Sequence, residues 1–273
     1  MKRLLLVLIR GALCGGLCSI SLSACEAPAT PFPVEIAATE TMPSPIATIE
    51  PIRYALDVNT IGFIAEMDQL QAAAQVEILG TTANPADLGG RYDLVAAYGA
   101  QSGWTLSPIT LHIALVIGQI EDETLSEILR ASINPQIVVD NLGIPGAIAE
   151  PTDILSASTL RAQMANRGKP DGYGLAIGAA YLPGAAQIVE QWTAINIETR
   201  LLWMSNAQIF TALESGEIQI ALITWTTSEE RQNWVERFGA ENIIDLYTLP
   251  ISYLAVPGLN ISFTPGGWPL AER

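Results

Sequence analysis

Apolar and polar positions alternate with two different periods from residue 52 onward. Short apolar runs, which are typical of strands, cover residues 53–57, 76–79, 93–98, 109–117, 173–177, 197–203 and 218–225. Between these runs, apolar residues recur three and four positions apart, as at Ile188, Trp192 and Ile195, and this spacing predicts helices with one buried face. Strands that alternate with helices predict an α/β fold with mostly parallel strands.

Polar residues stand where several of these helices would begin. Ser, Asp and Asn are favoured there because their side chains accept a hydrogen bond from a free backbone N–H of the first turn. The predicted N-caps are Asp122, Asn134, Ser205 and Ser228. Glu229 and Glu230 follow the last of these caps, where acids are favourable for the helix dipole.

The first 24 residues contain three bases and no acid, and they include a short apolar stretch. A basic start followed by such a stretch is the pattern of a secretory signal. The segment ends in Leu22-Ser23-Ala24-Cys25, which resembles the lipobox of bacterial lipoproteins. This resemblance implies a lipoprotein signal peptide over 1–24 and lipidation of Cys25. The alternative is a signal that is cleaved elsewhere, with an incidental cysteine.

Residues 25–51 are predicted to form an extended tether between the lipid and the folded body. Residues 26–51 hold six of the 17 prolines, four glutamates and no base. Such a composition buries too little apolar area to order a segment, and proline keeps it extended. The alternative is an irregular arm that packs on the domain.

Charge and cysteine content exclude several kinds of partner. Without residues 1–24, ten bases face 28 acids, which gives a formal charge of −18. Such a body repels nucleic acid and anionic lipid, so membrane contact is expected through the N-terminal lipid only. Cys14 and Cys18 lie in the signal and Cys25 takes the lipid, so we expect neither a disulfide nor a thiolate metal site.

Signals of enzymatic chemistry are weak. His112 is the only histidine and lies in the apolar run 109–117, so it is predicted to be a core or edge residue. No nucleophile elbow, P-loop or dinucleotide-binding glycine motif stands at a junction between a strand and a helix. The chain is therefore predicted to be no enzyme and to need no cofactor or metal. An exported hydrolase that depends on His112 is the alternative.

Four passages between residues 110 and 270 stand in the order found in a known family. They are residues 131–138, residues 160–173 with Pro170-Asp171-Gly172-Tyr173, residues 197–203 together with 212–221 and Trp225, and residues 249–253. Together they resemble the extracellular solute-binding proteins of family 5, the oligopeptide, dipeptide and nickel type that serves ABC importers. The resemblance covers roughly the C-terminal half of that family, so the chain is identified as a shortened and divergent member.

The resemblance implies a two-lobed fold like that of type II periplasmic binding proteins, with a reduced first lobe. The first lobe would comprise residues 52–118 and 250–273, and the second residues 119–249. It also implies a lipid-anchored protein on the outer face of the cytoplasmic membrane, in the periplasm or at the cell surface. There it would capture a small organic solute, peptides among the candidates, and deliver it to the subunits of an ABC permease.

The predicted ligand site lies beyond the carboxyl ends of the strands, where ligands of α/β folds bind. Aromatic residues at strand ends suit organic ligands, whereas Trp192 and Trp234 are assigned to the core and Trp203 to either place. The predicted ligand-binding residues are Trp225, Thr226, Thr227, Tyr181, Trp104 and Tyr98.

The segment after Trp225 departs from the family pattern. In peptide-binding members, an aspartate a few residues after the matching tryptophan holds the amino group of the ligand. Here Glu229 and Glu230 stand nearby, either in that role or as acids of a helix start. The missing aspartate and the short first lobe are the grounds for an alternative function, a transport-inactive sensor or surface interaction module.

Overall fold

The computed structural model describes residues 52–57, 74–79, 88, 91–120, 122–179, 182–264, 267 and 269–272. The predicted signal peptide and the whole predicted tether, Cys25 included, lie outside these residues. Ile64, Met67 and Leu70 also predict a helix at 61–73 by their spacing, and that segment lies outside the described residues as well. No described helix is long and apolar enough to cross a membrane.

The described elements alternate between strands and helices, as the sequence pattern predicts. In chain order they are β1 (Ile52–Asp57), β2 (Ala74–Leu79), β3 (Leu94–Tyr98), β4 (Thr105–Ile117), α2 (Glu123–Ser132), α3 (Pro135–Leu142), β5 (Ile148–Ala149), α4 (Ala157–Asn166), β6 (Tyr173–Ala179), α5 (Ala185–Thr193), β7 (Ile197–Trp203), α6 (Asn206–Glu214), β8 (Ile220–Trp225), α7 (Ser228–Phe238), the three-residue helix η3 (Ala240–Asn242), β9 (Ile243–Ala255), β10 (Asn260–Phe263) and β11 (Pro269–Glu272).

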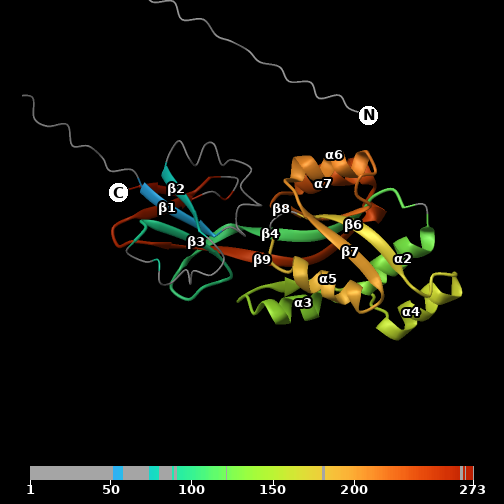
Figure 1. Cartoon of the computed structure of the whole chain (residues 1–273). Helices are drawn as coiled ribbons and strands as arrows, with labels where there is room; N and C mark the ends of the chain where they lie inside the picture. Colours follow the sequence, from blue (N-terminus) through green and yellow to red (C-terminus); the bar gives the residue numbers. More distant parts are fainter. Residues whose placement is uncertain are drawn as a thin grey trace, which may run out of the picture. The chain divides into compact units, whose positions relative to one another are not determined.

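Nine of these strands form one sheet (Figure 1). Its order is β2-β1-β3-β9-β4-β8-β6-β7, and the short β5 pairs with β9. β1 runs parallel to β2 and β3, and β6 runs parallel to β7 and β8. Between these two parallel groups, β9 and β4 run antiparallel to each other and to their outer neighbours β3 and β8.

The predicted α/β class is confirmed, but the sheet is mixed, and the expectation of mostly parallel strands is wrong at its centre. An apolar run such as 109–117 shows that a strand is buried on both faces, which is usual in parallel sheets. It does not show the direction of the neighbouring strand. That direction is set by β9, which returns through the middle of the sheet late in the chain.

The two long central strands join the two parallel groups. β9 pairs with β3 through its last five residues, Ile251–Ala255, whereas β4 pairs with β8 through its last six, His112–Ile117. Ile49–Arg273 forms one compact unit. The boundaries of the two lobes proposed from the sequence therefore remain a prediction.

Helices cover both faces of the parallel group of β6, β7 and β8, with α6 and α7 on one side and α5, beside α3, on the other (Figure 1). Trp192 of α5 is fully buried, and its indole Nε1 donates a 2.9 Å hydrogen bond to the hydroxyl of Ser132 at the end of α2. The hydroxyl of Tyr247 on β9 donates to the carbonyl of Pro183, just before α5. Burial raises the pKa of that phenol well above its usual range, so it stays a donor. These bonds fix the helices against the sheet.

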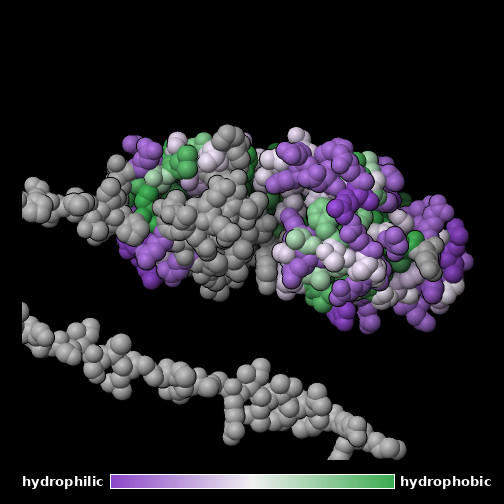
Figure 2. All heavy atoms as spheres, turned by 90° about the horizontal axis from the view of Figure 1, so that it is seen from above, coloured by the Kyte–Doolittle hydropathy of each residue, from purple (hydrophilic) through white to green (hydrophobic). Residues whose placement is uncertain are grey.

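The outer surface on the side of α6 and α7 is mostly hydrophilic, with small apolar patches (Figure 2). Within α7, only Trp234 is buried, and it stacks on Phe210 of α6. Trp192 and Trp234 are thus core residues, as predicted.

Three of the four predicted N-caps are confirmed: Asp122, Asn134 and Ser205 each accept a hydrogen bond from the backbone of the first helical turn. Ser228 is wrong by one position. Thr227 has the extended backbone of a cap, and its hydroxyl accepts from the N–H of Glu230. The sequence offers two neighbouring hydroxyl residues there, and the backbone conformation decides between them.

Candidate functional site

The carboxyl ends of β6, β7 and β8 lie at one edge of the sheet, because the three strands are parallel and adjacent. The last residues of β7 and β8 are Trp203 and Trp225. Trp225 lies opposite His112 of β4, and His112 lies opposite Thr248 of β9. This edge therefore borders the middle of the two long central strands.

The other parallel group, β1, β2 and β3, ends at the same level. Tyr98, the last residue of β3, lies opposite Ile251 of β9, and the next residue, Gly99, donates its N–H to the carbonyl of Pro250 at 2.7 Å. The strand ends of both parallel groups thus converge on the middle of β4 and β9. In open α/β sheets, ligands bind beyond such strand ends. We call this region, defined by Tyr98, His112, Trp225 and Pro250, the convergence site.

Trp225 is held from two sides. Its ring lies 5.9 Å from the His112 imidazole, centroid to centroid, with an interplanar angle of 9°. The guanidinium carbon of Arg231 lies 5.7 Å from the centroid of the same ring. Trp225 is 4% exposed, so in this conformation its ring is covered by its neighbours.

Thr226 and Thr227 connect Trp225 to α7, and their polar groups already have partners. One carboxylate oxygen of Glu230, Oε2, accepts from the backbone N–H of Thr226 at 2.6 Å and of Thr227 at 3.3 Å. It also accepts from the Thr226 hydroxyl at 3.2 Å. Glu230 therefore completes a capping box, which confirms its assignment as a helix-start acid.

Arg231 places a positive charge beside the ring of Trp225. It also forms an ion pair with Asp245 of β9, at 3.1 Å from Nη2 to Oδ2. The second oxygen of Asp245, Oδ1, is buried and has no hydrogen-bond partner among the described residues. The guanidinium is thus fixed between an aromatic face and a carboxylate.

Of the other predicted ligand residues, only Tyr98 lies at the convergence site in the described part of the chain. Tyr98 is half-buried at the convergence site, and its carbonyl accepts from the side-chain amide of Gln101 at 3.2 Å. Trp104 packs instead against a small cluster of the first parallel group that includes Tyr92 and Val95. Tyr181 lies outside the described residues. The ligand-binding roles of Trp225, Thr226, Thr227, Tyr98, Trp104 and Tyr181 remain predictions.

His112, Pro250 and Arg231 belong to this region, and the sequence pattern assigned none of them to the site. A lone histidine in an apolar run carries no signal of its neighbour, because cross-strand partners depend on register. Arg231 lies on α7, six residues after Trp225, which is no recognisable spacing. Trp203, left open by the sequence, is 46% exposed at the end of β7.

The described residues hold no group of three or more His, Cys, Asp or Glu side chains placed to bind a metal ion. No protein-family model matches the sequence, and no curated protein matches it. Solved structures do match, and among them are a substrate binding protein, a dipeptide binding protein and an oligopeptide-binding protein.

A substrate binding protein from Microbacterium hydrocarbonoxydans, complexed with 4-hydroxybenzoate hydrazide, matches with a TM-score of 0.52 and 10% identity over 70% of this chain and 57% of its own. OppA from Haemophilus influenzae, complexed with the peptide RPPGFSPFR, matches with a TM-score of 0.49 and 10% identity over 68% and 54%. A dipeptide binding protein from Pseudoalteromonas sp. SM9913, complexed with Met-Leu, matches with a TM-score of 0.48 and 10% identity over 70% and 51%.

The chain therefore has the fold of a substrate-binding protein, which confirms at the level of fold the resemblance seen in the sequence. It spans only about half the length of the structures that it matches.

Proposed function

We propose that this chain is an extracytoplasmic solute-binding protein that captures a small organic solute, peptides among the candidates, at the convergence site. One observation carries the proposal. The carboxyl ends of both parallel groups meet at the middle of β4 and β9, so loops from both groups would reach a single ligand.

The central strands have the features of a hinge at this level. Their pairing shifts register between Leu106 and Thr110, where three residues of β4 oppose a single residue of β9. Pro108 lies in this irregular stretch, and Pro250 lacks a backbone N–H. A bulge of this kind weakens the ladder locally and permits a change of twist. A ligand that contacts both groups would favour a closed arrangement over an open one.

The chemistry of the convergence site favours an organic ligand with a planar or apolar part. The partly buried His112 stacks on the buried Trp225, and Arg231 adds a guanidinium beside the ring of Trp225. Aromatic walls bury large area with little loss of side-chain entropy, and the guanidinium would attract a carboxylate or carbonyl of the solute.

The cellular setting belongs to the same proposal. Lipid on Cys25 would anchor the chain to the outer face of the cytoplasmic membrane, and residues 26–51 would act as the tether. The body, with a formal charge of −18 after removal of residues 1–24, has little attraction for anionic lipid. The lipid would therefore hold the protein near an ABC permease that accepts the solute.

The proposed function predicts that the two parallel groups move closer together when a solute binds, and a distance between spin labels tests this. Spin labels are attached to cysteines at Gln75 on β2 and Asn233 on α7, both exposed, in the full-length chain with Cys14, Cys18 and Cys25 replaced by serine. Di- and tripeptides, amino acids, sugars and polyamines are added in turn. One chemical class should shorten and narrow the distance distribution.

The matched control pair carries its labels at Gln208 and Asn233, both on the same side of the central strands, and its distance should not change. Binding of a solute without any change between Gln75 and Asn233 would contradict closure.

A further inference from the structure

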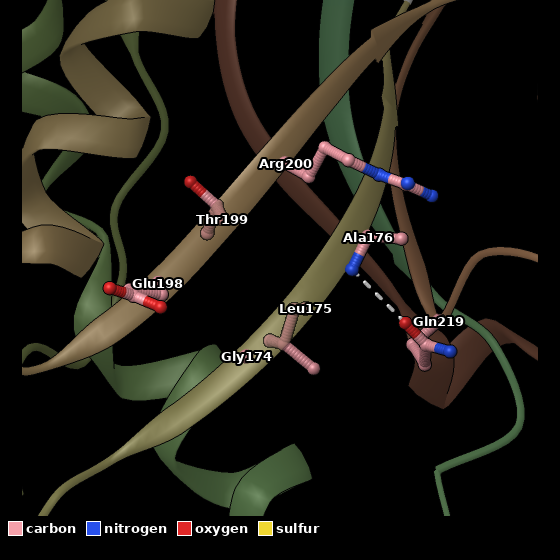
Figure 3. Close-up of a pocket in the computed structure, with 7 residues that line it drawn as sticks. All are labelled: Gly174, Leu175, Ala176, Glu198, Thr199, Arg200 and Gln219. Carbon is pink, nitrogen blue, oxygen red and sulfur yellow. Dashed lines mark hydrogen bonds between the residues drawn. The ribbon is translucent and has the colours of Figure 1, made fainter.

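The outer edge of β7 is open in the described part of the chain, where β7 pairs with β6 alone. Glu198 and Arg200 of this strand are exposed and line a shallow groove of about 620 Å³, with Gly174 and Ala176 of β6 at its floor (Figure 3). Neither charged side chain forms an ion pair with a described residue.

Two hydrogen bonds show which peptide groups of β7 face outward. Tyr173 donates its N–H to the carbonyl of Asn196, and Met204 donates its N–H to the carbonyl of Ala179. Peptide groups alternate in direction along a strand, so the even-numbered residues of β7 bond to β6. The N–H and C=O groups of Ile197, Thr199 and Leu201 therefore point away from the sheet.

This edge is complementary to itself. In an antiparallel pair centred on Thr199, that residue lies opposite Thr199 of a second copy, and Ile197 lies opposite Leu201. All of these residues have outward peptide groups, so six backbone hydrogen bonds would form, two for each of the three residue pairs.

The same register places opposite charges together. Glu198 lies opposite Arg200 of the second copy, and Arg200 lies opposite its Glu198. Both are non-hydrogen-bonded pairs, in which cross-strand side chains approach most closely. A shift by two residues in either direction would lose both ion pairs and place Glu198 opposite Glu198 or Arg200 opposite Arg200, so the charges select the register centred on Thr199.

The hydroxyl of Thr199 supports the same register independently of the charges. Its hydroxyl oxygen is buried and has no hydrogen-bond partner among the described residues. In the symmetric pair, the two Thr199 side chains lie on the same face, where threonines on adjacent strands can bond to each other.

We propose that β7 pairs antiparallel with β7 of a second copy of this chain, with a two-fold axis through Thr199. The two sheets then form one continuous sheet, and the exposed edge strand of each copy is covered. Charged side chains usually protect an exposed edge strand from pairing with other strands. Two opposite charges that stand two residues apart, however, are complementary to the same strand of a second copy.

Charge reversals test the proposal by sedimentation equilibrium of the full-length chain in a neutral, density-matched detergent. The natural chain should reach twice its monomer mass of 29.2 kDa at high concentration. Glu198→Arg and Arg200→Glu each place like charges at both cross-strand pairs, so each variant alone should dimerise at least about tenfold more weakly.

Mixing the two variants restores both ion pairs in a heterodimer, and the double variant Glu198→Arg/Arg200→Glu restores them in a homodimer. Both should dimerise like the natural chain. Both substituted positions are exposed, and circular dichroism checks that each variant folds. A natural chain that stays monomeric overturns the proposal, as does a dimer that single reversals do not weaken or that mixing does not rescue.

Discussion

At the scale of single residues, Trp225 is placed by the end of β8, and its ring contacts side chains from two other elements. The stacked imidazole of His112 and the guanidinium of Arg231 hold its ring, and neither contact follows from the spacing of residues in the sequence. The apolar composition of β8 predicts that Trp225 is buried, but it does not predict which side chains contact the ring.

Replacing His112 tests this arrangement. His112→Ala removes the stacked partner of Trp225 and should lower the free energy of unfolding by about 1 kcal/mol, a typical value for an aromatic pair. His112→Phe keeps a flat ring and should retain most of the stability. Urea denaturation measures both. Equal losses for both variants would show that polar contacts of the imidazole matter more than stacking.

The pair of Tyr173 and Asp122 makes stability depend on pH. The phenol donates a hydrogen bond to the carboxylate and is the main cause of a lowered pKa of Asp122. Burial, followed by the same hydrogen bond, raises the pKa of Tyr173 from 10.0 to about 12. Because the pKa of Asp122 is lower in the folded than in the unfolded chain, its carboxylate stabilises the fold at any pH above the unfolded pKa. This stabilisation is lost as pH falls through the folded pKa. The raised phenol pKa stabilises the fold below pH 10.0, and this is lost as pH rises toward about 12.

Tyr173→Phe should therefore lower the free energy of unfolding by about 1 kcal/mol near neutral pH, and the difference from the natural chain should shrink at both extremes. Denaturation measured across pH 3 to 11 or so tests the shape of this curve. Asp122→Asn is the matched control, because asparagine still caps α2 but does not titrate in acid. A difference that is constant over the whole range would contradict the pair as its source.

At the scale of elements, the start of α7 connects the strand-end edge to the outer layer. Thr227→Ala removes the hydroxyl that accepts from Glu230 and should lower the free energy of unfolding by about 1 kcal/mol. Thr227→Ser keeps a capping hydroxyl and should cost only a few tenths of a kcal/mol. Thermal unfolding measures the stability of both variants. If Thr227→Ser loses as much stability as Thr227→Ala, the effect comes from the methyl group of the threonine and not from the capping hydroxyl.

The elements themselves were largely predictable, because apolar periodicity and polar caps are local. Asp122, Asn134 and Ser205 begin helices as expected. The direction of β9 was not predictable, because parallel and antiparallel partners leave the same apolar run on a buried strand. The pairing of His112 with Trp225 was hidden for a related reason, since cross-strand neighbours depend on a register set by the whole sheet.

At the scale of the whole molecule, two parallel groups share a pair of long central strands, and their strand ends meet where the pairing of those strands is irregular. This arrangement, together with the fold of substrate-binding proteins, supports solute capture between the groups. An edge-paired dimer through β7 would leave this site available, because β7 lies at the end of the sheet, three strands from β4.

The most direct test of solute capture is thermal unfolding of the full-length chain with peptides, amino acids, sugars and polyamines. A true ligand at 100 times its Kd adds about 2.7 kcal/mol to the free energy of unfolding. For a chain of this size, that raises the midpoint by roughly 5 to 10 °C. We predict a shift of this size for one chemical class, reduced by Trp225→Ala relative to the unliganded variant. Absence of a shift with every class would contradict solute capture, and a shift that Trp225→Ala leaves intact would remove the ligand from the convergence site.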